Sequence, residues 1–270
     1  VHYFGITEDL AELRLLCCAH KIVLIEDRAL CGFDPYLKNK DYGDLVIYSI
    51  WKFHPIGEGA ILKISGRPLP RNIRIETRPL FVRIKRGIKI FLKYILVRLG
   101  IPIKAFQKIN NKFEAPLHEV LDENFNKDFG LFSISKKSQM VFFREDLKIC
   151  KSERIRNFNN LYEFCSRNSI PTLFGKVGLE SVPYCLPVIV NSAESLQISM
   201  RKDGIETEIS INPPCEIESL VVRSENKFEE ITDLAGRVLS IPIHQDIDDV
   251  RLMHIKGSLM KHLSPQLLDK

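Results

Sequence analysis

Two ionisable side chains follow short apolar segments in this chain of 270 residues. Asp27 ends the segment KIVLIED, and Lys52 follows the segment LVIYSIW. A buried carboxylate or ammonium group costs free energy unless it is paired or used. If the two segments are neighbouring parallel strands, both side chains lie at the carboxyl edge of the sheet, where α/β proteins bind ligands.

An acid and an amine at one sheet edge indicate a specific cofactor chemistry. A carboxylate keeps the pyridine nitrogen of pyridoxal 5'-phosphate protonated, and a lysine amine forms an imine with its aldehyde. The pair therefore predicts a pyridoxal phosphate site that contains Asp27 and Lys52, with Lys52 as the catalytic amine. The structural alternatives are a strand-end carboxylate that caps the next turn and an ordinary surface lysine.

The composition sets the class of protein. An apolar fraction of 45% and a charged fraction of 27% are ordinary for a globular chain, and the length allows one large or two modest domains. No C-x-x-C pair is followed by a second pair, so we expect no zinc ribbon and no metal centre. No secretory leader, membrane-length apolar run or nucleic-acid-binding module is visible, which favours a cytoplasmic protein with reduced thiols.

Apolar periodicity predicts alternating elements. Strands are expected at 1–4, 22–26, 45–50 and 60–64 with a helix at 7–21, as in a right-handed βαβ unit with a parallel sheet. A long helical pattern covers 134–168, and later segments predict strands at 183–190, 208–212 and 237–243 with helices at 193–203, 226–236 and 247–264. The fold class is therefore α/β: a mainly parallel sheet with helices in residues 1–150, then a small α+β domain in residues 151–270.

Seven sequence words carry a family resemblance: VHYFG, LIEDRAL, YGDLVIYSIWK, GEGAIL, RIRNFNNLYEFC, PYCLPVIV and RVLSIPIHQDI. By these words and their order, the chain resembles the DegT/DnrJ/StrS sugar aminotransferases, which are fold type I enzymes that use pyridoxal phosphate. The resemblance implies that Lys52 forms the imine, that Asp27 pairs with the pyridinium nitrogen, and that Ser49 donates its hydroxyl to the cofactor phosphate. The turn at 57–59 stands at the family's distance from the lysine.

The resemblance also implies an activity and its partners. It implies a transaminase that moves an amino group from glutamate to a keto-sugar nucleotide, acting as a homodimer whose subunits share each site. Other fold type I activities fit less well. Cys31 is too near Asp27 to be a desulfurase nucleophile, and the family's dehydratases replace the lysine that Lys52 retains.

Two departures from the family pattern keep an alternative open. Leu30 stands where the family places Gln or His near the phenolic oxygen of the cofactor, and Leu30 has no hydrogen-bonding atom. The family's long N-terminal portion before VHYFG has no counterpart here, so we expect an incomplete large domain that binds the cofactor weakly or needs a partner chain. The alternative is a truncated, non-catalytic relative that binds a partner or regulates.

One segment is unusually basic. Residues 71–108 carry eleven Lys and Arg residues against the single acid Glu76, with apolar residues at helical spacing. The segment fits a solvated helix face, an attraction for an anionic nucleotide sugar, or a peripheral contact with an anionic membrane.

His54 and His244 could contact substrate, but structural or surface roles are favoured.

Overall fold

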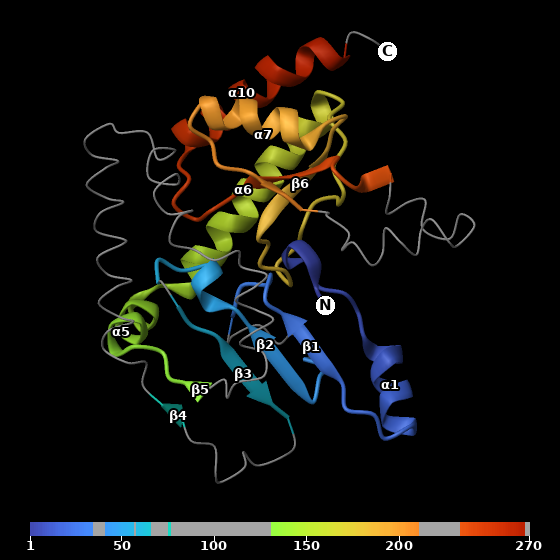
Figure 1. Ribbon diagram of the computed structural model, residues 1–270, viewed down its shortest axis with the longest axis vertical. Helices are drawn as coiled ribbons and strands as arrows, with labels where there is room; N and C mark the ends of the chain where they lie inside the picture. Colours follow the sequence, from blue (N-terminus) through green and yellow to red (C-terminus); the bar gives the residue numbers. More distant parts are fainter. Residues whose placement is uncertain (35–40, 57, 66–74, 77–130, 211–232, 268–270) are drawn as a thin grey trace, which may run out of the picture. The chain divides into compact units, whose positions relative to one another are not determined.

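The structure is a computed structural model that describes residues 1–34, 41–56, 58–65, 75–76, 131–210 and 233–267. Figure 1 shows its helices and strands. The chain divides into two compact units, one formed by residues 1–67 and 140–270 and the other by residues 68–139. The sequence analysis instead predicts a boundary between two domains at residue 150, and that boundary stays a prediction.

The first sheet contains three short strands. β1 (Ile25–Arg28) pairs in parallel with β2 (Leu45–Tyr48), and β2 pairs antiparallel with β3 (Ile61–Ile64), as Figure 1 shows. The predicted parallel neighbours at 22–26 and 45–50 are thus confirmed, with β1 shifted toward its polar end. The α/β class is also confirmed in its general form.

The N-terminal segment differs from the prediction. Residues 1–4 were expected as a strand, but the structure has the 3-10 turn η1 (Tyr3–Gly5), and the helix α1 (Ala11–Ala19) is shorter than 7–21. Phe4 and Gly5 both have positive φ, 59° and 81°, which turns the chain away from an extended path. The predicted βαβ unit around the first helix is therefore wrong.

The second sheet lies in the C-terminal part of the same unit. Its order is β6 (Cys185–Ile189), β8 (Val238–Pro242) and β7 (Glu208–Ile209), and both pairings are antiparallel. Two helices, α6 (Leu147–Arg167) and α7 (Ala193–Lys202), pack on this sheet, and α10 (Asp249–Leu267) packs on both of them. The strands predicted at 183–190 and 237–243 and the helices predicted at 193–203 and 247–264 are thus present, while a separate small α+β domain stays a prediction.

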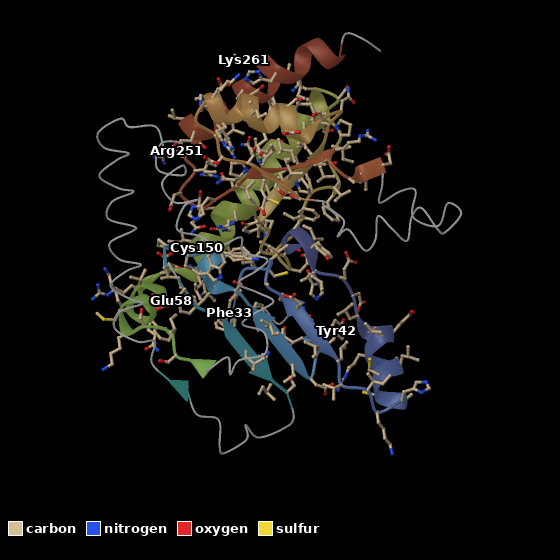
Figure 2. The ribbon with its side chains drawn as sticks, viewed as in Figure 1. Phe33, Tyr42, Glu58, Cys150, Arg251 and Lys261 are labelled. Carbon is tan, nitrogen blue, oxygen red and sulfur yellow. The ribbon has the colours of Figure 1, made fainter. Side chains whose placement is uncertain are left out.

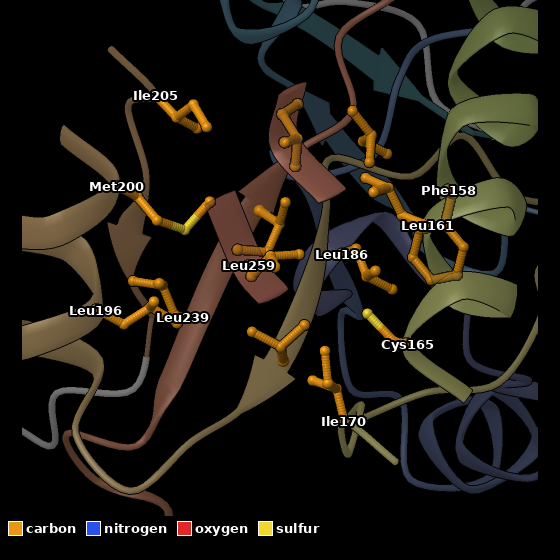
Figure 3. Packing of buried hydrophobic residues seen from close by; sticks show 14 of the residues in the cluster. Phe158, Leu161, Cys165, Ile170, Leu186, Leu196, Met200, Ile205, Leu239 and Leu259 are labelled. Atoms are coloured by element: carbon orange, nitrogen blue, oxygen red, sulfur yellow. The ribbon is translucent and has the colours of Figure 1, made fainter. Parts of the chain in front are cut away.

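Apolar side chains from these helices and strands form one core. Phe158 and Leu161 of α6 meet Leu186 of β6, Leu239 of β8 and Leu259 of α10, as the close view in Figure 3 shows, and each is completely buried. Burying such side chains contributes about 1.5–3 kcal/mol each before chain entropy is counted.

A break divides the long helix predicted at 134–168. α5 (Lys136–Arg144) ends before Asp146, whose Oδ1 accepts hydrogen bonds from the backbone N–H groups of Lys148 (3.0 Å) and Ile149 (3.2 Å). This is an N-cap, which satisfies donors that a continuing helix would have paired. The break leaves Glu145 between two helices, outside either one.

The remaining elements are short. β4 (Ile75–Glu76) pairs in parallel with β5 (Leu131–Phe132) in the second unit, and η2 (Ile50–Lys52) follows β2. Gly57, the rest of the basic segment 71–108 and most of the helix predicted at 226–236 lie outside the described residues. None of the helices in the described part of the chain is both long and apolar enough to cross a membrane.

Candidate active site

Lys52 lies on the rim of a pocket. It ends η2, one turn beyond β2, and its side chain is half-buried. The pocket has a volume of about 280 Å³, and Lys52 shares its wall with residues of α6, β6, β7 and β8. Among the polar lining residues are Arg154, Tyr184, Glu206, Thr207, Glu208, Ser240 and His244.

Arg154 brings a buried positive charge to this pocket. Its Nε donates to Oε1 of Gln245 at 2.8 Å, and its Nη1 donates to the backbone oxygens of Pro183 and Tyr184, both at 3.3 Å. The guanidinium carbon lies 4.7 Å from the ring centre of Phe53, in a cation–π contact. All three acceptors are neutral. Burial lowers the pKa of Arg154 to about 10, so the side chain stays charged at neutral pH.

Unlike Arg154, another polar group in the pocket has no hydrogen-bond partner. Oγ1 of Thr207 is buried and makes no hydrogen bond. A buried hydroxyl without a partner costs about 1–3 kcal/mol, so a bound ligand that reaches it would recover this free energy. The pocket thus combines the amine of Lys52, the guanidinium of Arg154 and this hydroxyl with two carboxylates, those of Glu206 and Glu208.

Asp27 lies elsewhere. It is the third residue of β1, pairs in register with Ile47, and is half-buried. Its Oδ1 accepts a hydrogen bond from the backbone N–H of Ala29 at 2.8 Å, which caps the turn after the strand. The residues that line the pocket of Lys52 do not include Asp27.

Ser49 is buried and immediately precedes η2. Its backbone oxygen accepts from the N–H of Lys52 at 3.3 Å, so it helps to form the turn that carries the lysine. It does not line the pocket of Lys52 either. The structure therefore places Lys52 in a pocket without bringing Asp27 and Ser49 into the same pocket, and the cofactor roles of all three stay predictions. Leu30 is half-buried in the turn after β1.

A buried ionic cluster next to Asp27 escaped the sequence analysis. Glu26 lies on the opposite face of β1, where its Oε1 accepts from Nε2 of His2 (2.8 Å) and from Arg28, and its Oε2 accepts from the N–H groups of Tyr42 (2.8 Å) and Gly43 (2.9 Å). Burial alone would raise the pKa of Glu26, but these hydrogen bonds outweigh it and lower the pKa to about 2. The sequence analysis missed Glu26 because the residue stands at a buried position of β1, where an alternating strand pattern predicts an apolar side chain.

The same face of the first sheet opens into a second pocket. Its volume is about 250 Å³, and it is lined in part by Arg28, Cys31, Phe33, Asp41 and Tyr48. The hydroxyl of Tyr48 donates to Asp41 at 2.8 Å, and the ring of Phe33, which Figure 2 labels, contacts Tyr48 edge-on at 5.2 Å. Burial raises the pKa of the Cys31 thiol to about 12, so the thiol stays protonated at neutral pH.

The two histidines considered in the sequence have different positions. His244 lines the pocket of Lys52 and is half-buried, and burial lowers its pKa. His54 is buried in the turn after η2, and its Nδ1 has no hydrogen-bond partner.

Comparisons with known proteins give the fold. No protein-family model and no curated protein sequence match this chain. Among solved structures, a DegT DnrJ EryC1 StrS aminotransferase from Brucella abortus matches with a TM-score of 0.58 and 13% identity, over 96% of this chain and 62% of that one. PseC from Helicobacter pylori, an aminotransferase of pseudoaminic acid biosynthesis, matches with a TM-score of 0.63 and 13% identity, over 97% and 65%.

A putative PLP-dependent aminotransferase from Bacillus cereus also matches, with a TM-score of 0.56 and 15% identity, over 95% of this chain and 63% of that one. The chain therefore has the fold of the DegT/DnrJ/EryC1/StrS aminotransferases, and the resemblance seen in the sequence is confirmed at the level of fold. The chain spans less than two thirds of the length of these three structures.

Proposed function

We propose that this chain acts as a pyridoxal phosphate-dependent transaminase that moves an amino group from glutamate to the keto group of a nucleotide sugar. The observation that carries the proposal is the position of Lys52 in a pocket with the buried guanidinium of Arg154, within a chain that has the fold of sugar aminotransferases. A homodimer in the cytoplasm is part of the same proposal and rests on the family analogy alone.

The side chains of this pocket fit the cofactor. When bound, pyridoxal phosphate supplies an aldehyde that takes up amino groups and a ring that withdraws electrons. The amine of Lys52 is the group that can hold the aldehyde covalently. Arg154 offers a charged fork for a phosphate or a carboxylate, and the unpaired hydroxyl of Thr207 offers a further polar contact.

The roles of the chain's own residues follow from their chemistry. Nζ of Lys52 would accept the proton from the α-carbon of the amino donor and return it to the product. The guanidinium of Arg154 would orient the carboxylate of the donor or the cofactor phosphate. The contacts of Asp27 with the pyridine nitrogen and of Ser49 with the phosphate stay predictions from the family resemblance, because neither residue lines this pocket.

A trapping experiment tests this proposal. The chain is mixed with pyridoxal phosphate, treated with borohydride, digested and analysed by mass spectrometry. The reduced adduct is expected on the peptide that contains Lys52, and Lys52→Arg should remove it. Lys63→Arg is the matched control, because Lys63 lies on β3 and binds Asp41 outside the pocket of Lys52. An adduct spread evenly over surface lysines, or one that survives Lys52→Arg, contradicts the proposal.

Two observations favour the non-catalytic alternative, a relative that binds a partner or regulates. Asp27 does not line the pocket of Lys52, and Leu30 offers no hydrogen bond near the end of β1. In that case neither the wild-type chain nor Lys52→Ala would develop absorbance at the edge of the visible range with pyridoxal phosphate. Absorbance in the wild-type chain alone would support the transaminase.

A further inference from the structure

Three side chains that the proposed transaminase does not use meet beside α6. They are His54, Glu145 and Cys150, and their ligand atoms all lie within 4.8 Å of one another. Nδ1 of His54 lies 3.6 Å from Oε2 of Glu145, and Sγ of Cys150 donates a hydrogen bond of 3.2 Å to the same oxygen. An imidazole, a carboxylate and a thiol therefore converge on one point.

The unsatisfied nitrogen of His54 is the second observation. His54 is 5% exposed, and its Nδ1 is buried without a hydrogen-bond partner. A buried ring nitrogen of this kind costs free energy comparable to a lost hydrogen bond. Nδ1 faces Glu145 at a distance too long for a hydrogen bond but suited to two atoms that share a third between them.

The fold holds each of the three residues in place. The ring of His54 contacts the ring of Phe142 edge-on, with centroids 5.0 Å apart, and its backbone N–H donates to Ile50 at 3.1 Å. Glu145 lies in the break between α5 and α6, and Cys150 lies in the first turn of α6, where its N–H donates to Asp146 at 3.0 Å. Figure 2 labels Cys150 near the beginning of α6.

The distances agree with a tetrahedral ion. Zinc binds nitrogen and oxygen at roughly 2.0–2.1 Å and thiolate at roughly 2.3 Å, so its ligand atoms lie roughly 3.3–3.6 Å apart. Two of the three separations, 3.6 Å and the 3.2 Å of the thiol hydrogen bond, come close to this range, and the atoms of His54 and Cys150 lie within 4.8 Å of one another. Thiolate and imidazole together select zinc over magnesium or calcium, which prefer ligand sets made of oxygen.

We propose that His54, Glu145 and Cys150 form a binding site for a divalent cation of the zinc type, with water as the fourth ligand. Sγ of Cys150 gives its proton to solvent when the ion binds, and Nδ1 of His54 gains the partner it lacks. The side chain of Glu145 is 23% exposed, which leaves an entry path for the ion and room for the water.

The charges around the site balance a dication. The carboxylate of Glu145 and the thiolate of Cys150 supply two negative charges. Arg154, one turn further along α6, opposes the ion, but its hydrogen bonds hold it toward Gln245, Pro183 and Tyr184. Such an ion would join the turn that follows Lys52 to the start of α6. The site does not depend on the proposed transaminase activity.

Metal binding to the full chain tests the site. Titration of the metal-free chain with Zn²⁺ should give one equivalent bound, and Co²⁺ should give a near-ultraviolet sulfur-to-metal charge-transfer band. Each of His54→Gln, Glu145→Gln and Cys150→Ser should raise the dissociation constant at least about a hundredfold, since even outer-shell changes cost about 10–100-fold. Cys150→Ser should also remove the charge-transfer band.

Two controls separate this site from adventitious binding and from misfolding. The double variant Cys18→Ser/His20→Gln removes an exposed thiol and an exposed imidazole on and beside α1, and it should bind zinc like the wild type. Glu145→Gln changes a partly exposed side chain, so its melting temperature without metal should equal that of the wild type, while the rise in melting temperature on adding Zn²⁺ should be lost. Zinc binding that survives Glu145→Gln, a band that survives Cys150→Ser, or less than one equivalent bound to the wild type overturns the proposal.

Discussion

Nε2 of His2 donates a hydrogen bond of 2.8 Å to Oε1 of Glu26, although the two residues are 24 positions apart. Both residues are 1% exposed. Nδ1 of His2 accepts from the backbone N–H of Glu8 at 3.0 Å, so the imidazole carries its proton on Nε2. This pair anchors the N-terminal segment to β1 in place of the strand that the sequence predicts there.

The hydrogen-bonded pair of His2 and Glu26 makes the free energy of unfolding depend on pH. The pKa of Glu26 is lowered to about 2 in the folded chain, so its carboxylate stabilises the fold above the ordinary carboxyl pKa and this contribution is lost as the pH falls toward 2. Glu26→Gln should lower the free energy of unfolding at neutral pH by on the order of 3 kcal/mol, because it leaves Arg28 and three other donors badly matched. It should also flatten the pH dependence between about 5 and 2. Urea denaturation at several pH values measures both effects.

Glu163→Gln is the control for that experiment. Glu163 pairs with Lys176 at 2.6 Å on the surface, and this hydrogen bond lowers the pKa of Glu163 as well. Because surface ion pairs contribute little, this variant should unfold like the wild type. If Glu26→Gln and Glu163→Gln have the same pH profile, the buried cluster does not set the acid sensitivity.

Gly5 and Gly257 should respond to alanine in opposite directions. A Cβ on Gly5 would lie 2.6 Å from the backbone oxygen of Val182 and 2.7 Å from the backbone nitrogen of Tyr184, and Gly5 has a φ of +81°. Gly5→Ala should therefore cost at least about 1–2 kcal/mol from the left-handed backbone alone, with the clash in addition. Gly257 lies within α10, and apart from its chain neighbours and the helix's own backbone no atom lies within 4 Å of such a Cβ, so Gly257→Ala should stabilise by about 0.5–1 kcal/mol. The melting temperatures of the two variants measure these effects. Equal shifts of the same sign would contradict the packing of η1.

Arg154 should matter for stability as well as for ligand binding. Arg154→Ala removes the cation–π contact with Phe53 and leaves Gln245 and two backbone oxygens without their donor. We expect a loss of roughly 3 kcal/mol in the free energy of unfolding. Arg167→Ala, at an exposed position near the end of the same helix, should change it by less than about 0.5 kcal/mol. Chemical denaturation of both variants checks this, and an unchanged Arg154→Ala would show that the guanidinium does not hold the pocket wall.

Asp203 should control the docking of α10. Its carboxylate accepts hydrogen bonds from Lys261 (2.9 Å), Ser258 (2.8 Å) and His262 (2.8 Å), all on α10, and these bonds lower its pKa. Asp203→Asn should increase hydrogen exchange in α10 while leaving β6 protected. Asp233→Asn, which loses only a surface pair with Arg237, should leave the exchange of α10 unchanged. Equal exchange of α10 in both variants would mean that the apolar core alone holds the helix.

Sequence alone located most elements of the C-terminal part. The helix expected at 193–203 is α7 (Ala193–Lys202), and the strand expected at 237–243 is β8 (Val238–Pro242). Both predictions hold because apolar periodicity is local: the side chains that face the core recur at the spacing of the element that carries them. The parallel pairing of β1 with β2 and the fold of the family could also be predicted from the sequence.

Tertiary structure decided how distant residues meet. Residues 1–4 have strand-like composition, but the close approach of Gly5 to residues 182–184 makes them a turn. His54 and Glu145 are separated by more than ninety positions, and no local pattern links them, because their meeting depends on the break at Asp146 and on the packing of Phe142 against the imidazole. The sequence by itself was enough to single out Lys52 and to predict the strand before it. Only the packed chain decided that Arg154, rather than Asp27, lies in the pocket of Lys52, since burial and register depend on all the elements at once.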